Sequence, residues 1–108
     1  MTFRVRIASA AWRDLEEIYT WIAEHDSPEN AGYVLDRLTE TAESVAKMPY
    51  RGSRPDELPA GMEGEFRQVF FKPYRVVYEI GRDEVVIYLV ADGRRNLQSL
   101  MLRRLMGD

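Results

Sequence analysis

The chain has 108 residues, of which 45% are hydrophobic and 31% charged, with a net charge of −3 and no cysteine. This length supports one domain around one core, and the composition is that of a globular protein rather than a disordered one. The absence of cysteine excludes disulfides, thiolate catalysis and cysteine-ligated metal sites, and it fits a reducing cytoplasm.

Nothing in the sequence predicts a membrane segment. No apolar run approaches the roughly 20 residues that a membrane-spanning helix needs. The first residues, Met1–Ile7, are polar at every second position and lack the apolar stretch of a signal peptide. We therefore expect a cytoplasmic protein.

The beginning of the chain predicts a strand followed by a helix. Thr2–Ile7 alternates apolar and polar side chains, which is typical of a half-buried strand. Ser9 is a candidate N-cap, because its hydroxyl can accept a hydrogen bond from a free backbone N–H group. The helix that follows runs from Ala10 to about His25, and its apolar stripe consists of Ala11, Leu15, Ile18 and Ile22.

A second helix begins almost at once. Ser27 is a candidate N-cap, and Pro28 occupies the first helical position, where its missing N–H group has no cost. The apolar periodicity reaches Met48, and Pro49 ends the helix. Because so few residues join the two helices, we expect an antiparallel helical hairpin.

The second half predicts a sheet. Residues 49–64 are rich in Pro and Gly and form a loop with one helical turn at Glu57–Pro59. A helix follows the sheet over Asn96–Met106. The strands between them are Glu65–Phe71, Tyr74–Ile80 and Glu84–Ala91, joined by turns short enough for hairpins.

These elements predict a single α+β domain over residues 1–108. An N-terminal strand precedes a helical hairpin, which packs on a small, mainly antiparallel sheet, and a short helix ends the chain. We expect the first strand to pair with the last one.

The familiar motifs of nucleotide, zinc-protease and serine-nucleophile sites are missing from the sequence. His25 is the only histidine, which excludes a histidine triad or a multi-histidine metal site. We expect neither a metal nor a cofactor, and we favour no residue as catalytic.

Glu65 and Arg67 form the one arrangement that suits acid–base chemistry. They are two residues apart on a predicted strand, so their side chains share a face of the sheet. A carboxylate beside an arginine suits RNA cleavage, in which the base takes the 2′-hydroxyl proton and the cation stabilises the phosphate. The pattern favours the alternative, an ordinary ion pair.

The arginines of the second half are the stronger signal. Residues 1–48 carry 5 Lys/Arg against 9 Asp/Glu, whereas residues 49–108 carry 10 against 9. This asymmetry predicts a face for an acidic partner, and arginine binds carboxylate and phosphate groups in a bidentate manner. We expect consecutive strands to bring Arg67, Arg75 and Arg94 to one side. With Arg95 and Tyr74 they form the predicted partner-binding set.

Five segments carry a family resemblance when taken in order: SAAWRDLEEIYTWI, SPENAGYVLDRL, MPYRGSRPDEL, GEFRQVFFKPYRVVYEI and VVIYLVADGRRNLQSLMLRRL. Over nearly its whole length the chain resembles the RelE/ParE superfamily, also called plasmid stabilisation proteins. The resemblance implies the toxin half of a type II toxin–antitoxin pair in a bacterial or archaeal cytoplasm. It also implies a cognate antitoxin, whose disordered segment folds over the toxin.

The resemblance leaves two targets open. ParE-like toxins poison DNA gyrase and look non-catalytic in themselves, whereas RelE-like toxins cut messenger RNA in the ribosomal A site. For the nuclease branch, the resemblance points to Arg67, Arg75, and Arg94 or Arg95. On this alternative, Glu65 or a tyrosine would carry the proton.

The chain departs from the nuclease pattern. Ser99 stands where some nucleases have a tyrosine, and Ala91–Gly93 contains no histidine. Glu63 and Glu65 stand where some members have lysines. These departures and the negative net charge favour a gyrase-inhibiting, ParE-like toxin that is not an enzyme. A ribosome-dependent mRNA endonuclease is the alternative, and a pure interaction module is a third hypothesis.

Overall fold

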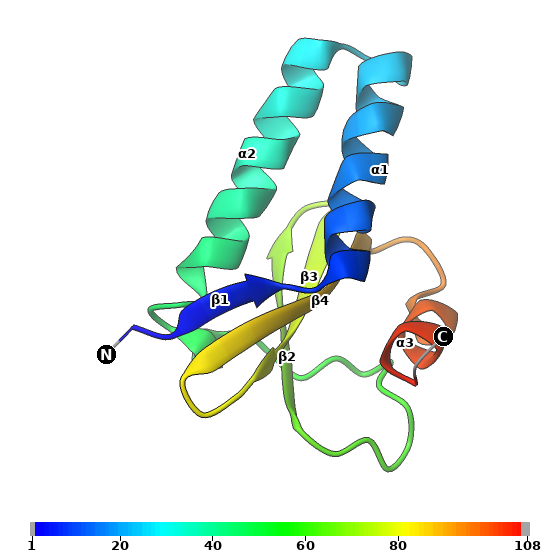
Figure 1. Ribbon diagram of the computed structural model, residues 1–108. Helices are drawn as coiled ribbons and strands as arrows, with labels where there is room; N and C mark the ends of the chain where they lie inside the picture. The colour runs from blue at the N-terminus through cyan, green and yellow to red at the C-terminus, as the bar shows by residue number, and fades with distance from the viewer. Residues whose placement is uncertain (1, 107–108) are drawn as a thin grey trace.

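The computed structural model describes residues 2–106, which fold into a helical hairpin, a four-stranded sheet and a short last helix (Figure 1). This confirms the predicted α+β architecture. The elements are β1 (Arg4–Ile7), α1 (Ser9–His25), α2 (Pro28–Ser44), the 3-10 turn η1 (Pro49–Arg51), β2 (Glu65–Phe71), β3 (Tyr74–Ile80), β4 (Glu84–Asp92) and α3 (Leu97–Leu105).

The strand order is β1-β4-β3-β2, so the first strand pairs with the last, as predicted. β1 runs parallel to β4, and the other two pairs are antiparallel. The register shifts within the β3–β4 pair. Val77 pairs with Leu89 and Tyr78 with Ile87, so Tyr88 is an extra residue in β4, which is the signature of a β-bulge.

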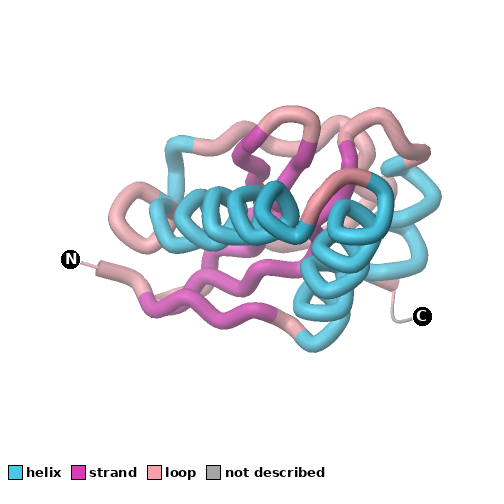
Figure 2. The backbone as a smooth tube through the Cα atoms, turned by 90° about the horizontal axis from the view of Figure 1, so that it is seen from above, coloured by secondary structure: helices cyan, strands magenta, loops and turns pink. Residues whose placement is uncertain are grey.

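The helical hairpin covers one face of the sheet, and Figure 2 shows α1 and α2 lying over the strands. Apolar residues recur at helical spacing on α1 and α2, so each helix turns one stripe towards the strands. The helices contribute Ala11, Leu15, Ile22, Ala31, Val34, Leu38, Ala42 and the following Val45, and the strands contribute Val69, Val76, Tyr78, Ile80, Val85, Ile87 and Val90.

A second, smaller core lies on the opposite face of the sheet. There α3 packs Leu97 and Met101 against the sheet, and Leu58 of the long loop packs beside them. The strands supply Val77, Leu89 and Ala91. Both faces of the central strands are therefore buried, which explains why Glu84–Asp92 reads as an almost unbroken apolar run.

The start of α1 differs from the prediction. Ala8, not Ser9, is the N-cap residue, and no side chain caps this end. The N–H group of Ala8 donates to Ile87 O while its carbonyl accepts from the N–H group of Trp12. Ala8 therefore ends the pairing with β4 and starts the helix, which leaves no capping position for Ser9. At α2 the prediction is confirmed, because Ser27 Oγ accepts from the N–H group of Asn30 and Pro28 is the first residue.

The end of α2 and the following loop also differ from the prediction. α2 stops at Ser44 rather than at Met48, because the carbonyl of Ala46 turns to accept a hydrogen bond from the N–H group of Phe3. The predicted helical turn at Glu57–Pro59 is wrong. The helical turn of this loop is instead η1, at its beginning.

Candidate functional site

The arginines of the sheet do not lie on one face. Arg67 pairs across the strands with Tyr78, which faces the helical hairpin. Arg75 is three residues before Tyr78 on β3, so it faces the opposite side, where α3 packs. The expectation that Arg67, Arg75 and Arg94 converge is therefore wrong for Arg67 and Arg75.

Arg67 is tied into the edge of the sheet. Its Nε donates to Glu65 Oε2 at 2.8 Å and its Nη1 to the carbonyl of Gly52 at 2.9 Å. Its guanidinium also lies over the ring of Tyr50, 5.6 Å from the centroid. Glu65 and Arg67 thus share a face, as predicted, and form an ion pair along one strand.

Arg75 anchors the long loop on the other face. Its Nη1 donates to both carboxylate oxygens of Glu57 at 2.9 Å and to Gln68 Oε1 at 3.2 Å. The side chains of Arg75 and Glu57 are only 22% and 25% exposed. The guanidinium of Arg75 is therefore already paired with a carboxylate of the same chain. Sequence analysis missed Glu57, because nothing local links an acidic loop residue to a strand 18 positions later.

Arg94 and Arg95 follow β4 side by side, but their surroundings differ. Arg94 donates through Nε and Nη2 to Asp92 at 2.9 and 2.6 Å, and its backbone N–H group also donates to Asp92 Oδ1. The hydrogen bonds from Arg94 hold the pKa of Asp92 below its usual value. Arg95 is exposed, and within residues 2–106 its guanidinium has no ion-pair partner.

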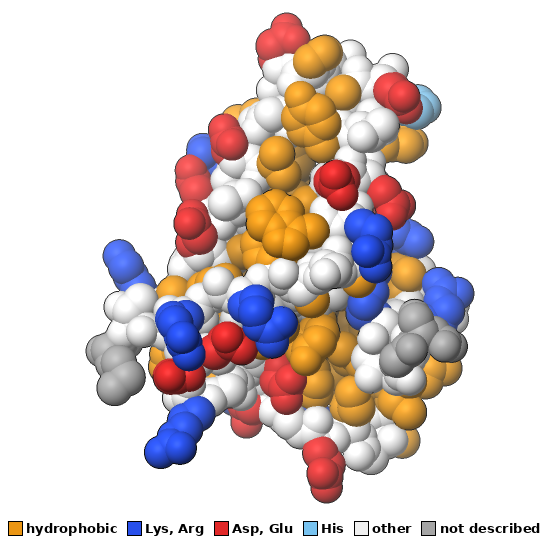
Figure 3. All heavy atoms as spheres, viewed as in Figure 1, with side chains coloured by type: hydrophobic (Ala, Val, Ile, Leu, Met, Phe, Trp, Pro, Cys, Tyr) orange, Lys and Arg blue, Asp and Glu red, His pale blue; other side chains and the backbone are white. Residues whose placement is uncertain are grey.

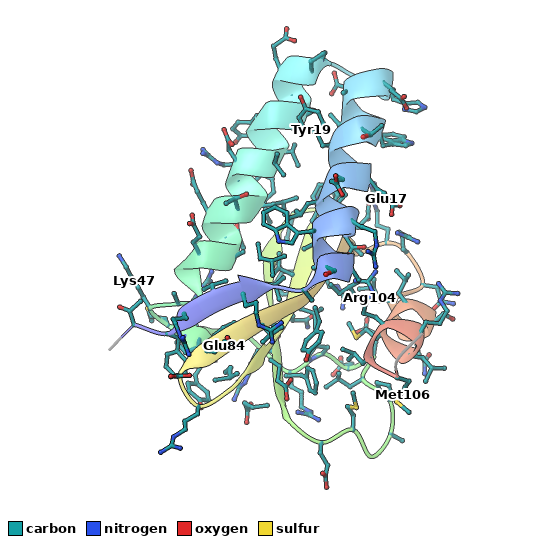
Figure 4. All side chains as sticks on the ribbon, viewed as in Figure 1. Glu17, Tyr19, Lys47, Glu84, Arg104 and Met106 are labelled. Carbon is teal, nitrogen blue, oxygen red and sulfur yellow. The ribbon has the colours of Figure 1, made fainter. Side chains whose placement is uncertain are left out.

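Arg104 is a further arginine with a definite role, and it lies on α3. It donates through Nη1 and Nη2 to the two oxygens of Asp14 at 2.8 and 2.9 Å, and through Nη1 to Tyr88 O at 2.7 Å. Figure 4 shows Arg104 between α3 and the lower part of α1. The sequence did contain a signal for this role. Arg104 lies seven residues after Leu97 and three after Met101, a spacing that places it on the buried side of α3.

A cleft of about 410 Å³ lies between α1 and the end of β4. One wall comes from α1, with Asp14, Glu17, Ile18 and Trp21 at helical spacing. The other wall and the floor come from the strands and the segment after β4, with Tyr74, Val90, Ala91, Asp92, Arg94 and Arg95. Three of the predicted partner-binding residues, Tyr74, Arg94 and Arg95, therefore come together here, and Arg67 and Arg75 do not.

The aromatic residues of this cleft are of two kinds. Tyr74 is half-buried, and burial, reinforced by the nearby Asp92, raises its pKa. Trp21 is 61% exposed and stacks on His25, with ring centroids 4.4 Å apart. His25 Nδ1 lies 2.9 Å from the carbonyl of Trp21, so the histidine is a local partner of this ring.

The surface view separates apolar, acidic and basic regions. In Figure 3, hydrophobic side chains form a strip along the helical hairpin with acidic side chains beside it, and Lys and Arg gather lower, near β1 and beside α3. Across residues 2–106, no cluster of three or more His, Asp or Glu side chains is placed to hold a metal ion. No helix in the same part of the chain is long and apolar enough to cross a membrane.

Comparison with known sequences identifies a matching family. Residues 5–97 match the family described as the ParE toxin of the type II toxin-antitoxin system parDE. Toxin ParE3 of Caulobacter vibrioides is 27% identical over 84 residues, which cover 78% of this chain and 80% of that protein.

Solved structures with a similar fold come from toxin–antitoxin systems and from a toxin. The chromosomal ParDE system of P. aeruginosa matches with a TM-score of 0.69 at 17% identity, over 84% of this chain and 96% of that chain. The toxin–antitoxin complex RelBE2 of Mycobacterium tuberculosis gives 0.62 at 24% identity, over 85% and 92%. A mutant of the E. coli toxin RelE in the free state gives 0.61 at 14% identity, over 94% of each chain. At these identities the structures bear on the fold alone.

Proposed function

Because the chain belongs to the ParE toxin family of type II toxin–antitoxin systems, we propose that it inhibits DNA gyrase by binding to it, in the cytoplasm, until a cognate antitoxin neutralises it. In this proposal the toxin stalls gyrase in the state in which DNA is cleaved. It carries out no bond-breaking chemistry of its own.

The distribution of the arginines carries this proposal. Cleavage of RNA needs cations that converge on one phosphate, together with a group that moves a proton. Arg67 and Arg75 lie on opposite faces of the sheet, and each is paired with a carboxylate of the chain, Glu65 or Glu57. Arg94 is likewise paired with Asp92. This arrangement favours binding to a protein target over phosphate chemistry.

The overall charge supports the same conclusion. A nuclease that acts on the ribosome works among backbone phosphates, which favour a protein with many uncompensated cations. This chain has a net charge of −3. In its second half, the four cations Arg67, Arg75, Arg94 and Arg104 are each paired with a carboxylate within the fold.

The test compares two targets with the same purified chain. Relaxed plasmid is incubated with gyrase, ATP and increasing amounts of the chain, and both supercoiling and trapped double-strand breaks are measured. We expect supercoiling to fall and breaks to accumulate near equimolar amounts, and both effects to disappear when antitoxin is added first. Unchanged supercoiling without DNA breakage would rule out the proposal.

The parallel arm tests the RelE-like alternative. The chain is added to a translating extract, and message ends are mapped. Codon-phased cleavage that Arg67→Ala abolishes would establish the nuclease. We expect no cleavage of this kind.

A further inference from the structure

The long loop between η1 and β2 is closed on itself at its base. Its start is fixed to β2, because Ser53 makes two backbone hydrogen bonds to that strand. The next residue, Arg54, donates through Nη1 to the carbonyl of Gly64 at 3.2 Å and through Nη2 to that of Met62 at 3.3 Å. Loops whose two ends meet form compact units that can move together. We call residues 54–64 the strap.

Two adjacent side chains fasten the middle of the strap. Glu57 accepts hydrogen bonds from Arg75 on β3, and Leu58 packs against the smaller core, which α3 covers. Figure 1 shows the loop passing close to α3. In the described residues, the strap makes one backbone–backbone hydrogen bond, from the N–H group of Met62 to Pro59 O. Segments with so few fixed contacts open at a fraction of the free energy that global unfolding requires.

Arg75 forms an anion-binding position that the strap covers. Its Nη1 donates to Gln68 Oε1 at 3.2 Å, and its guanidinium carbon lies 5.9 Å from the centroid of the Phe70 ring. Both contacts come from β2, so they hold the guanidinium in place independently of the strap. A guanidinium in a fixed position binds the oxygens of carboxylates and phosphates. In the closed protein the carboxylate of Glu57 occupies this position, and the side chains of Arg75 and Glu57 are only 22% and 25% exposed.

Opening of the strap and binding of an anion to Arg75 are therefore linked. An external oxyanion makes its full contact with Arg75 only after Glu57 has left, so it binds the open strap more tightly than the closed one. A ligand with this preference shifts the equilibrium towards the open form, and opening raises the affinity for the ligand by the same factor. Arg67 lies on the other face of the sheet and does not join Arg75 in the opened position.

We propose that the strap is a conformational switch, in which the Glu57–Arg75 pair is the latch and an oxyanion that replaces Glu57 on Arg75 releases it. The closed form covers Arg75 and buries part of Leu58, and the open form exposes both. An anion thereby controls access to this face of the sheet. The inference goes beyond the proposed function and does not depend on the identity of the target.

Single cysteines report the opening, because the chain contains none of its own. Leu58→Cys places a thiol in the smaller core, Ala60→Cys at an exposed position of the strap, and Val76→Cys in the larger core. Iodoacetamide, a neutral reagent, alkylates each thiol only while it is accessible. We expect the thiol at position 58 to react more slowly than that at position 60, and at least about tenfold faster than that at position 76. A rate equal to either reference would contradict a strap that opens by itself.

The latch is tested by Glu57→Gln in the first two of these backgrounds. We expect alkylation at position 58 to become at least about fivefold faster and alkylation at position 60 to stay within about twofold, because only the latch is lost. Glu63→Gln is the matched control. It removes the same charge from an exposed residue of the strap that has no ion pair within residues 2–106. Equal effects of Glu57→Gln and Glu63→Gln at position 58 would overturn the inference.

The anion is tested with sodium phosphate and sodium acetate, each compared with sodium chloride at equal ionic strength. We expect phosphate or acetate to make alkylation at position 58 at least about twofold faster than chloride does. This difference should disappear in Glu57→Gln, whose latch is already released. The more effective anion identifies the class of ligand. No acceleration by either anion would contradict the proposed release of the latch.

Binding to Arg75 gives the reciprocal measurement. The Nε–H signal of Arg75, assigned by its loss in Arg75→Lys, is followed by NMR during titration with phosphate and, separately, with acetate. For the more effective anion, Glu57→Gln should lower the Kd at least about fivefold, because the competing carboxylate is gone, and Glu63→Gln should leave it within about twofold. Equal Kd values for the unmodified chain and Glu57→Gln would reject the latch. Circular dichroism confirms that each variant is folded.

Discussion

Asp14 and Arg104 form a bidentate ion pair that joins the first helix to the last across 90 positions of the sequence. The same carboxylate accepts the N–H group of Val90, and the same guanidinium donates to the carbonyl of Tyr88. Tyr88 is the bulge residue of β4, and Val90 follows it by two positions. The pair therefore supplies hydrogen bonds where the ladder of the sheet is disrupted, and it fixes α3 in place.

We expect Arg104→Ala to lower the free energy of unfolding by about 2–3 kcal/mol, because the carboxylate of Asp14 would lose its counter-charge while remaining largely buried. Asp14 and Arg104 are 14% and 20% exposed, so solvent reduces the cost somewhat. Urea denaturation measures the change. Arg103→Ala is the matched control at an exposed position and should stay within about 0.5 kcal/mol.

A double-mutant cycle with Asp14→Asn tests the pairing itself. If the two side chains act together, the double variant should be more stable than the sum of the single losses predicts, by more than about 1 kcal/mol. Additive losses would mean that the two residues stabilise the fold independently.

Gly52 is the position at which a methyl group should be most harmful. A Cβ atom there would lie 2.6 Å from the hydroxyl of Tyr78 and closer still to the carbonyl oxygen of Gln68. Gln68 O belongs to the bridge that joins the loop to β2, so it has little room to move. We expect Gly52→Ala to destabilise the protein by about 2–3 kcal/mol or more.

Gly32 offers the matched control in α2, since a Cβ atom there meets nothing within 4 Å. Gly32→Ala should raise stability by up to about 1 kcal/mol through helix propensity. Thermal unfolding of the two variants should therefore change in opposite directions. A loss of stability in both would point to an effect of alanine other than the contact at Gly52.

The elements were predictable because their signals are local. Apolar spacing defined both long helices, and Ser27 with Pro28 marked the start of α2. The errors arose where distant backbone groups intervene. At the start of α1, the N–H group of Ala8 donates to Ile87 O. After α2, the N–H group of Phe3 donates to the carbonyl of Ala46.

The separation of Arg67 and Arg75 was available from the sequence. A two-residue turn at Lys72-Pro73 sets Phe71 opposite Tyr74, and counting back places Arg67 opposite Tyr78. Arg75 then points to the other face. The partners of Arg75 and Arg104 were not available in this way, because Glu57 sits in an irregular loop and Tyr88 O is freed by a bulge.

Arg94→Ala should raise the pKa of Asp92 towards its usual value, because the hydrogen bonds from Arg94 are the main cause of its depression. A depressed carboxyl pKa stabilises the fold above about pH 4, and this contribution is lost as the pH falls through the folded-state pKa. NMR titration of the carboxyl carbon gives the pKa directly. Arg95→Ala, which removes only a more distant charge, should change it less, and an equal change would contradict this ranking.

Alkaline pH should destabilise the protein through the buried Tyr78 and the half-buried Tyr74 and Tyr88. Burial is the main cause that raises the pKa of Tyr74, Tyr78 and Tyr88. A raised pKa means that the folded state holds the proton more tightly than the unfolded state does. The corresponding stability is complete below about pH 10, the unfolded value, and falls as the pH rises through the folded-state pKa.

Tyr78→Phe separates this titration from packing. The hydroxyl of this fully buried side chain donates to Pro49 O at 2.5 Å, so its removal should cost about 1 kcal/mol at neutral pH. Above pH 10 the variant has one tyrosine fewer to ionise on unfolding. Its free energy of unfolding should therefore fall less steeply, by up to about 1.4 kcal/mol per pH unit. Urea denaturation from pH 8 to 11 measures both slopes, and parallel curves would show that Tyr78 does not contribute to alkaline unfolding.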